Sequence, residues 1–91
     1  MDAADIKKLL EKERLEKDVL NRIAWDDRLD GGDFEVAYLD RIKKGLVKVS
    51  YASISLQGDF FMSGESPIPV HRIREVSFRG AVVWAKRRAV S

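Results

Sequence analysis

The side chains best suited to chemistry lie together between residues 67 and 74, where the sequence reads Pro-Ile-Pro-Val-His-Arg-Ile-Arg. The two prolines keep the approach extended, because each fixes its own φ angle and restricts the residue before it. His71 and Arg72 follow directly. A guanidinium donates a two-pronged hydrogen bond to phosphate and an imidazole donates a proton or a hydrogen bond, so the two indicate a phosphate-binding pair.

The arrangement of these side chains depends on the backbone that carries them. In a regular strand, alternation puts Val70, Arg72 and Arg74 on one face and His71 on the other. A twist or bulge at Pro69 would instead bring His71 and Arg72 to one rim. A third interpretation stays open, in which His71 is a lone histidine bonded to a backbone carbonyl and the arginines are merely solvated.

Further basic residues continue toward the C-terminus. They predict a stripe suited to a phosphate backbone, made of Arg74, Arg79, Lys86, Arg87 and Arg88. A solvated tail explains the last three of them equally well.

Aromatic side chains offer stacking surfaces for nucleic-acid bases, although most of them are expected in the core. Trp25, next to an acidic loop, and Tyr38, next to Asp40 and Arg41, are the two that we expect to be exposed at a site.

Other chemistries find little support. Four aspartates between residues 26 and 33 resemble a divalent-cation site, but their spacing is not that of an EF-hand and aspartate is common in turns. His71 has no nucleophile elbow, and Gly31-Gly32 is a turn rather than a nucleotide-binding loop. With no cysteine and one histidine, thiolate and multi-histidine metal sites are excluded. We therefore predict no catalytic residue, no metal and no cofactor.

Charge divides the 91 residues into two unlike halves. Residues 1–40 hold 7 Lys and Arg against 12 Asp and Glu, a net of −5, whereas residues 41–91 hold 10 against 3, a net of +7. Such an asymmetry indicates an anionic partner for the basic half. The apolar runs are far shorter than the roughly 20 residues of a membrane span, and the charged N-terminus is unlike a signal peptide. We expect a cytoplasmic protein that does not enter membranes.

The N-terminal quarter of the chain reads as helical. Residues from Asp2 to about Ile23 contain no glycine or proline and are rich in Lys, Glu and Leu. The run Glu11–Asp18 is almost entirely charged, so either one long helix has a solvated middle, or an extension precedes a second helix, Val19–Ile23, capped by Asp18. We predict a charged helical extension over residues 1–17 and a single domain over residues 18–91.

Strand signals fill the rest of the chain. Alternation predicts a strand at Phe34–Leu39, which turns at Lys43-Lys44-Gly45 into a second strand at Leu46–Val49. A short strand follows at Phe60–Met62, while residues 51–56 are ambiguous. Residues 73–78 and 81–86 flank Arg-Gly, a hairpin signal. The expected fold class is α+β, with one or two N-terminal helices on a small antiparallel sheet of about 4–5 strands that ends in a hairpin.

Four blocks of this sequence together resemble a small, largely archaeal family, the RNA cyclic-group end recognition domain. They are Leu20–Asp26 (LNRIAWD), Tyr38–Arg41 (YLDR), Ile68–Val76 (IPVHRIREV) and Arg79–Trp84 (RGAVVW). The resemblance covers about Asp18–Arg88.

The resemblance implies binding of RNA ends that carry a 2′,3′-cyclic phosphate. It implies that His71 and Arg72 contact the terminal phosphate, and that Asp26 and Arg41 help to line the pocket, with Arg28 beside them. In larger proteins, members of the family lie next to RNA-processing domains such as 2H phosphoesterases.

The sequence departs from the family pattern at two positions. Asp27 stands where proline is common after Trp-Asp, and Ala85 stands where a polar residue often follows the final Trp. Asp27 adds negative charge near the expected phosphate contacts of Asp26 and Arg28.

Three hypotheses of function follow. The first is a non-enzymatic module that recognises single-stranded RNA ends with a cyclic or terminal phosphate, in RNA processing or repair and beside an RNA-processing enzyme. The second is a small phosphodiesterase-like enzyme that uses His71 as general acid or base, although such chemistry usually needs two groups. The third is an interaction subunit that docks a partner through its N-terminal helix.

Overall fold

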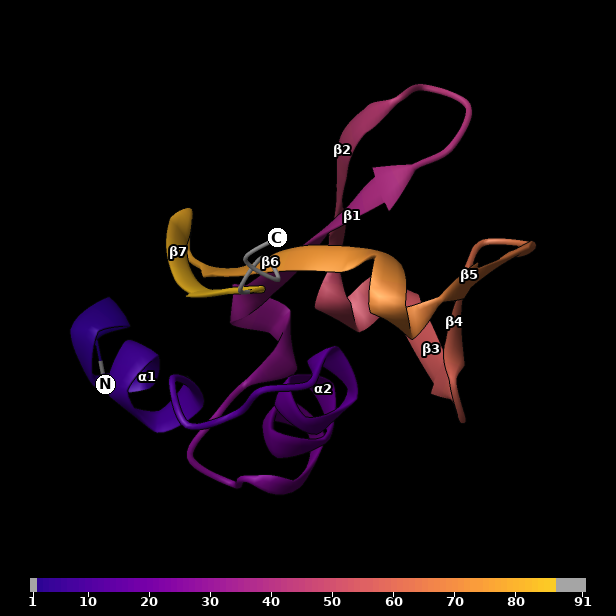
Figure 1. The fold of residues 1–91 in the computed structure, drawn as a ribbon. Coiled ribbons are helices and arrows are strands. Elements are labelled where there is room, and N and C mark those ends of the chain that lie inside the picture. The colour runs from indigo at the N-terminus through magenta and orange to yellow at the C-terminus, as the bar shows by residue number, and fades with distance from the viewer. Residues whose placement is uncertain (1, 87–91) are drawn as a thin grey trace.

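The computed structural model describes residues 2–86, which form two helices followed by seven strands. Figure 1 shows the helices on one side of the strands and a long hairpin that projects away from them. The α-helices are α1 (Ala3–Leu10) and α2 (Glu16–Trp25), and short 3-10 turns lie at η1 (Gly31–Asp33), η2 (Tyr51–Ser53) and η3 (Val70–Arg72). Within residues 2–86, no helix is long and apolar enough to cross a membrane.

The structure has two separate helices in the region where the sequence allowed either one long helix or two. Asp2 and Asp5 cap α1 reciprocally, each side chain accepting from the backbone N–H of the other. Asp18 does not cap α2: the helix begins two residues earlier, after extended Leu15, which supplies no side-chain cap. The reason is a tertiary contact, because the first residue of α2, Glu16, is buried against Lys86.

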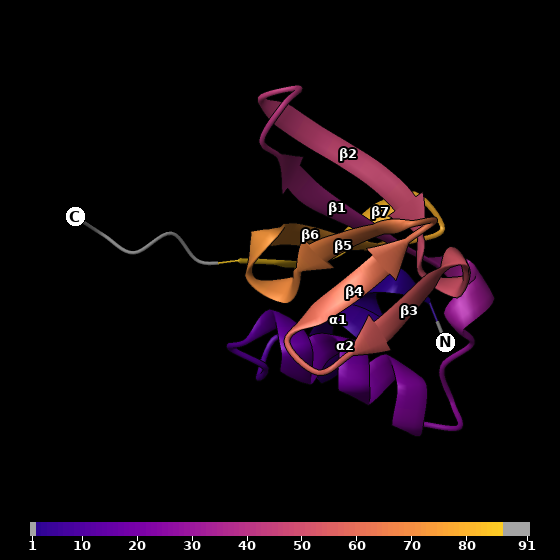
Figure 2. The ribbon, with the colours of Figure 1, turned by 90° about the vertical axis from the view of Figure 1, so that its right-hand side faces the viewer.

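The strands divide between two antiparallel sheets. The first has the order β2-β1-β6-β7, and the second has the order β3-β4-β5. The strands are β1 (Phe34–Asp40), β2 (Gly45–Ser50), β3 (Ile54–Gln57), β4 (Phe60–Ser63), β5 (Ser66–Pro69), β6 (Ile73–Phe78) and β7 (Ala81–Ala85). The α+β class and the closing β6–β7 hairpin are confirmed. The division into a four-stranded and a three-stranded sheet was not predicted, and Figure 2 shows the smaller sheet beside the larger one.

One hydrophobic core joins both sheets to both helices. Phe34, Val36 and Tyr38 of β1 face it, and the Tyr38 ring meets Phe61 of the second sheet edge to face at 5.6 Å. Helix α1 belongs to this core, since Leu10 is fully buried and α1 packs along β7. The division into an extension and a domain at residue 17 stays a prediction.

Candidate functional site

The η3 turn presents His71 and Arg72 between two buried anchors. Val70 and Ile73 lie in the core, and the Val70 N–H donates to the Asp59 carbonyl at 2.9 Å. His71 is exposed and Arg72 is half-buried, and neither side chain makes a hydrogen bond or ion pair with another described residue. Strand alternation therefore does not apply at η3, because a 3-10 turn has about three residues per turn.

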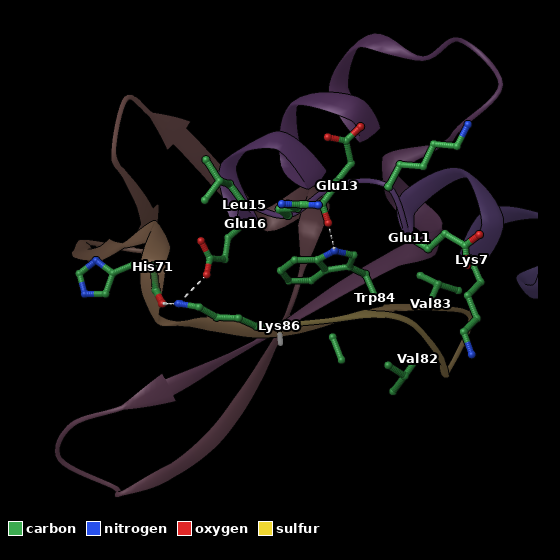
Figure 3. A pocket seen from close by; sticks show the side chains of 13 residues that line it. Lys7, Glu11, Glu13, Leu15, Glu16, His71, Val82, Val83, Trp84 and Lys86 are labelled. Atoms are coloured by element: carbon green, nitrogen blue, oxygen red, sulfur yellow. Dashed lines mark hydrogen bonds and ion pairs between the residues drawn. The ribbon is translucent and has the colours of Figure 1, made fainter. Parts of the chain in front are cut away.

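A largely buried ion pair between Glu16 and Lys86 supports the η3 turn. Glu16 Oε1 is enclosed, and the Lys86 ammonium lies 2.6 Å from it. The same ammonium donates to the His71 carbonyl at 2.9 Å. Figure 3 shows Lys86 between these two groups and the imidazole directed away from them. The pair thus fixes the backbone of η3 and leaves the His71 ring free toward solvent.

Sequence reasoning missed Glu16 and treated its neighbourhood as a solvated face. A signal was present: Glu16 lies four and seven residues before Leu20 and Ile23, which places it on the apolar face of the helix. Lys86 was expected in an open basic stripe, yet its charge is already balanced by Glu16.

The end of β1 lies close to Arg72. The pKa of Asp40 is lowered chiefly because its carboxylate accepts hydrogen bonds from the backbone N–H groups of Lys43 and Ile42, with smaller electrostatic contributions from Lys43 and Arg72. The exposed turn after Asp40 carries Arg41. Cations from β1–β2 and from η3 therefore gather at this edge around one carboxylate.

Arg74 lies at an irregularity in the sheet. The pairing of β1 with β6 shifts register between Ala37 and Tyr38, so Arg74 falls outside regular pairing. Its carbonyl accepts the Lys86 N–H at 2.7 Å, which places the backbones of Arg74 and Lys86 side by side.

The predicted contacts from the Trp-Asp motif lie elsewhere. Trp25 is the last residue of α2 and Asp26 caps the helix, about 14 Å along the helix from Glu16 at 1.5 Å per residue. The Arg28 guanidinium donates two hydrogen bonds to the Asp26 carboxylate, at 2.7 and 3.0 Å. Arg22 lies 3.6 Å from the same carboxylate. These hydrogen bonds from Arg28, supported by the charge of Arg22, hold the pKa of Asp26 well below its usual range.

The two aromatic residues differ in exposure. Trp25 is 82% exposed, as expected, whereas the expected exposure of Tyr38 is wrong, since only 7% of it is accessible. Tyr38 points to the core side of β1, against Phe61, so its ring has no open face for stacking.

The basic stripe is also interrupted. Arg79 follows β6 whereas His71 precedes it, so about 20 Å of strand separates them. Arg79 lies 3.3 Å from Asp33 and over the Phe78 ring. Arg87 and Arg88 lie outside the described residues.

Three of the four aspartates in the acidic loop bind the local backbone or form ion pairs. Asp30 accepts from the Gly32 N–H, while Asp26 and Asp33 pair with arginines. In the described part of the chain, no three acidic or histidine side chains come together as metal ligands do.

A groove of about 1090 Å³ adjoins η3. It lies between the α1–α2 connection and β7, and its lining includes His71, Lys86, Trp84 and Val82. The Trp84 indole N–H donates to the Glu13 carbonyl at 2.9 Å, which ties the connection to β7 across the groove.

Comparison with known proteins places these features in context. Residues 14–86 match the model of a family described as the MJ1316 RNA cyclic group end recognition domain. A "UPF0248 protein" from Thermococcus gammatolerans is 40% identical over 74 residues, which cover 79% of this chain and 89% of that protein. Another from Metallosphaera sedula is 35% identical over 77% of this chain and 90% of its own length. "UPF0248 protein MJ1316" from Methanocaldococcus jannaschii is 30% identical over 78% and 92%. No solved structure matches the chain significantly.

Proposed function

The chain belongs to the MJ1316 RNA cyclic group end recognition domain family, and from this membership we propose that it binds RNA 3′ ends that carry a 2′,3′-cyclic phosphate. The family description supports recognition of cyclic RNA ends in general. The residues that do so here, and the role of the protein in RNA processing or repair, are parts of the proposal.

The η3 turn is the observation that carries it. His71 and Arg72 are adjacent, reach solvent, and have no side-chain partner among residues 2–86. They are held on a backbone that Val70, Ile73 and Lys86 fix. Because this backbone is already fixed, anion binding costs conformational entropy only in the two side chains, which favours affinity.

The chemistry of a cyclic phosphate suits such a small site. The ring diester has one negative charge and two non-bridging oxygens, so a single guanidinium can meet both oxygens with its fork. The imidazole N–H of His71 supplies a further donor. Arg41 and Arg74 contribute positive potential from neighbouring elements without needing direct contact.

The protein would act as a binding module rather than as an enzyme. A lone histidine offers one acid–base group, whereas ring opening needs both activation of water and protonation of the leaving oxygen. The module would present RNA ends to an RNA-processing enzyme that supplies the chemistry.

The test compares three oligonucleotides of one sequence, ending in a 2′,3′-cyclic phosphate, a 3′-phosphate or a 3′-hydroxyl. Fluorescence anisotropy should give the highest affinity for the cyclic end. Arg72→Ala should lower that affinity about tenfold or more, the usual effect of losing a charged hydrogen bond, and His71→Ala should also weaken it. Equal affinity for all three ends would refute end recognition.

Arg79→Ala is the matched control, because it removes the same charge at the opposite end of the β6–β7 hairpin. It should leave the preference for the cyclic end intact. The recovered RNA is then examined for ring opening: turnover that disappears in His71→Ala would replace the binding module with the enzyme hypothesis.

A further inference from the structure

The groove between the α1–α2 connection and β7 is as large as the largest pockets that hold one small molecule. Pockets for single small molecules measure about 300–1000 Å³, and this groove has about 1090 Å³. Figure 3 shows His71 and Lys7 at opposite ends of the groove with Trp84 between them. One end of the groove therefore adjoins the proposed end-binding turn, and the other leads away from it.

The charges along the groove favour a polyanion. Lys7, Lys12 and Arg14 line it, and none of them pairs with another described residue. Three carboxylates also line the groove. Glu13 lies 3.7 Å from Arg22 and Glu16 is paired with Lys86, which leaves Glu11 as the carboxylate without a described partner. Three cations against one anion leave a positive balance.

Apolar side chains of β7 also line the groove. Val82 is 46% exposed and projects from the side of β7 opposite Trp84 (Figure 3), and Ala85, three residues further along, is exposed as well. Cations beside exposed apolar surface fit a single-stranded nucleic acid, whose phosphates meet the cations while a base covers the apolar surface.

We propose that this groove binds the RNA nucleotides that precede the cyclic end. The inference rests on the proposed function, because it takes the terminal phosphate at His71 and Arg72 as its starting point. The imidazole points away from Trp84. The bound RNA strand therefore crosses over Lys86 before it enters the groove. Lys12 and Arg14 then contact its backbone phosphates. Lys7 and Lys12 lie before the residues 14–86 that match the family model, whereas Arg14 lies within them.

The experiment measures affinity against length. The probes are 2′,3′-cyclic adenosine monophosphate and oligoadenylates of two to five nucleotides with the same cyclic end. Affinity should rise with the length of the RNA. The double variant Lys12→Ala/Arg14→Ala should bind the longest probe about tenfold more weakly than the wild type does, and it should bind the mononucleotide equally well. The slope of log affinity against log salt should become shallower by about 1.4, at about 0.7 for each phosphate contact on a single strand.

The control is Lys8→Ala/Lys48→Ala, which removes two exposed charges outside the groove. It should keep the gain with length. A gain that is absent in the wild type, or unchanged in the groove variant, would overturn the inference while the preference for cyclic ends stood. If the wild type showed no preference for the cyclic end, the proposed function itself would be refuted.

Discussion

Two arginines hold the carboxylate of Asp26 in its ionised form. Arg28 donates to it from both its side chain and its backbone, and Arg22 approaches from the preceding helical turn. Hydrogen bonds to a charged form stabilise that form, which lowers the pKa of Asp26. These contacts shape the loop after α2. They also occupy the N–H groups of Arg28 that a phosphate ligand would need.

The first prediction concerns Asp26→Asn. A pKa depressed by folding stabilises the native state above the unfolded pKa of about 4 and loses that contribution as the pH falls through the folded value. The variant should therefore have a lower urea midpoint than the wild type at pH 7. The two midpoints should converge as the pH falls below about 4, and a constant gap from pH 7 to pH 2 would contradict the assignment.

The second prediction concerns Lys86→Met, which leaves the Glu16 carboxylate buried without its partner. Removing one partner of a buried ion pair destabilises a protein by about 3 kcal/mol. Urea denaturation measures the change. Lys17→Met is the control, because its pair with Asp59 at 3.3 Å is exposed and should contribute less than about 1 kcal/mol. Equal losses for the two variants would contradict the buried role of Glu16.

At the scale of elements, α1 completes the core beside β7. The helix is short, with eight residues, and a helix of that length is marginal by itself in water. Its stability in the folded protein comes from burying Ile6 and Leu10.

The third prediction follows from that packing. Leu10→Ala should lower the free energy of unfolding by about 3 kcal/mol, because a buried leucine leaves a cavity. Leu9→Ala, at a half-buried neighbour, should have a smaller effect. If thermal denaturation gave the two variants the same melting temperature, α1 would be a loosely attached extension.

The β6–β7 hairpin depends on a left-handed turn. Arg79 and Gly80 have φ angles of 49° and 89°, the pattern of a two-residue hairpin turn that matches the twist of the strands. A side chain at the second position is strained.

The fourth prediction is that Gly80→Ala destabilises the protein by about 1 kcal/mol. Gly45→Ala is the matched substitution, since Gly45 begins β2 without a positive φ, and it should be nearly neutral. Chemical denaturation of the pair gives the difference, and a neutral Gly80→Ala would argue against the left-handed turn.

For the whole molecule, folding pairs the acidic half of the chain with the basic half. Glu16 meets Lys86, Asp33 meets Arg79, and Lys17 meets Asp59 across the divide. The net charge of +7 in residues 41–91 is therefore not displayed as one continuous basic surface. Cations that make no ion pair with a described residue lie around η3 and along the groove, and others, such as Lys48, lie on the β1–β2 hairpin.

The fifth prediction uses this distribution. A five-nucleotide RNA with a cyclic end should contact three cations, namely Arg72, Lys12 and Arg14. The slope of log affinity against log salt should then be about −2, at about 0.7 for each contact. Titrations between low and physiological salt measure it. A slope near −5 would indicate that the whole basic half binds the strand.

The amino-acid sequence was enough to predict the class of fold, and it singled out the residues of the candidate site, whose role stays a prediction. Alternating strands, the hairpin at Arg79-Gly80 and a helical N-terminus are local patterns, and local backbone preferences favour them wherever the chain lies. The His71-Arg72 pair was likewise visible, because its chemistry depends on residue type and adjacency.

The surroundings of that pair depend on the tertiary fold. Glu16 lies 55 positions before His71 in the numbering, yet it fixes the η3 backbone through Lys86. The same packing moved Tyr38 into the core and left Trp25, Asp26 and Arg28 at the far end of α2. Burial and ion pairing depend on which distant segments meet in space, and a carboxylate in a charged run has the same sequence signature whether water or a lysine finally faces it.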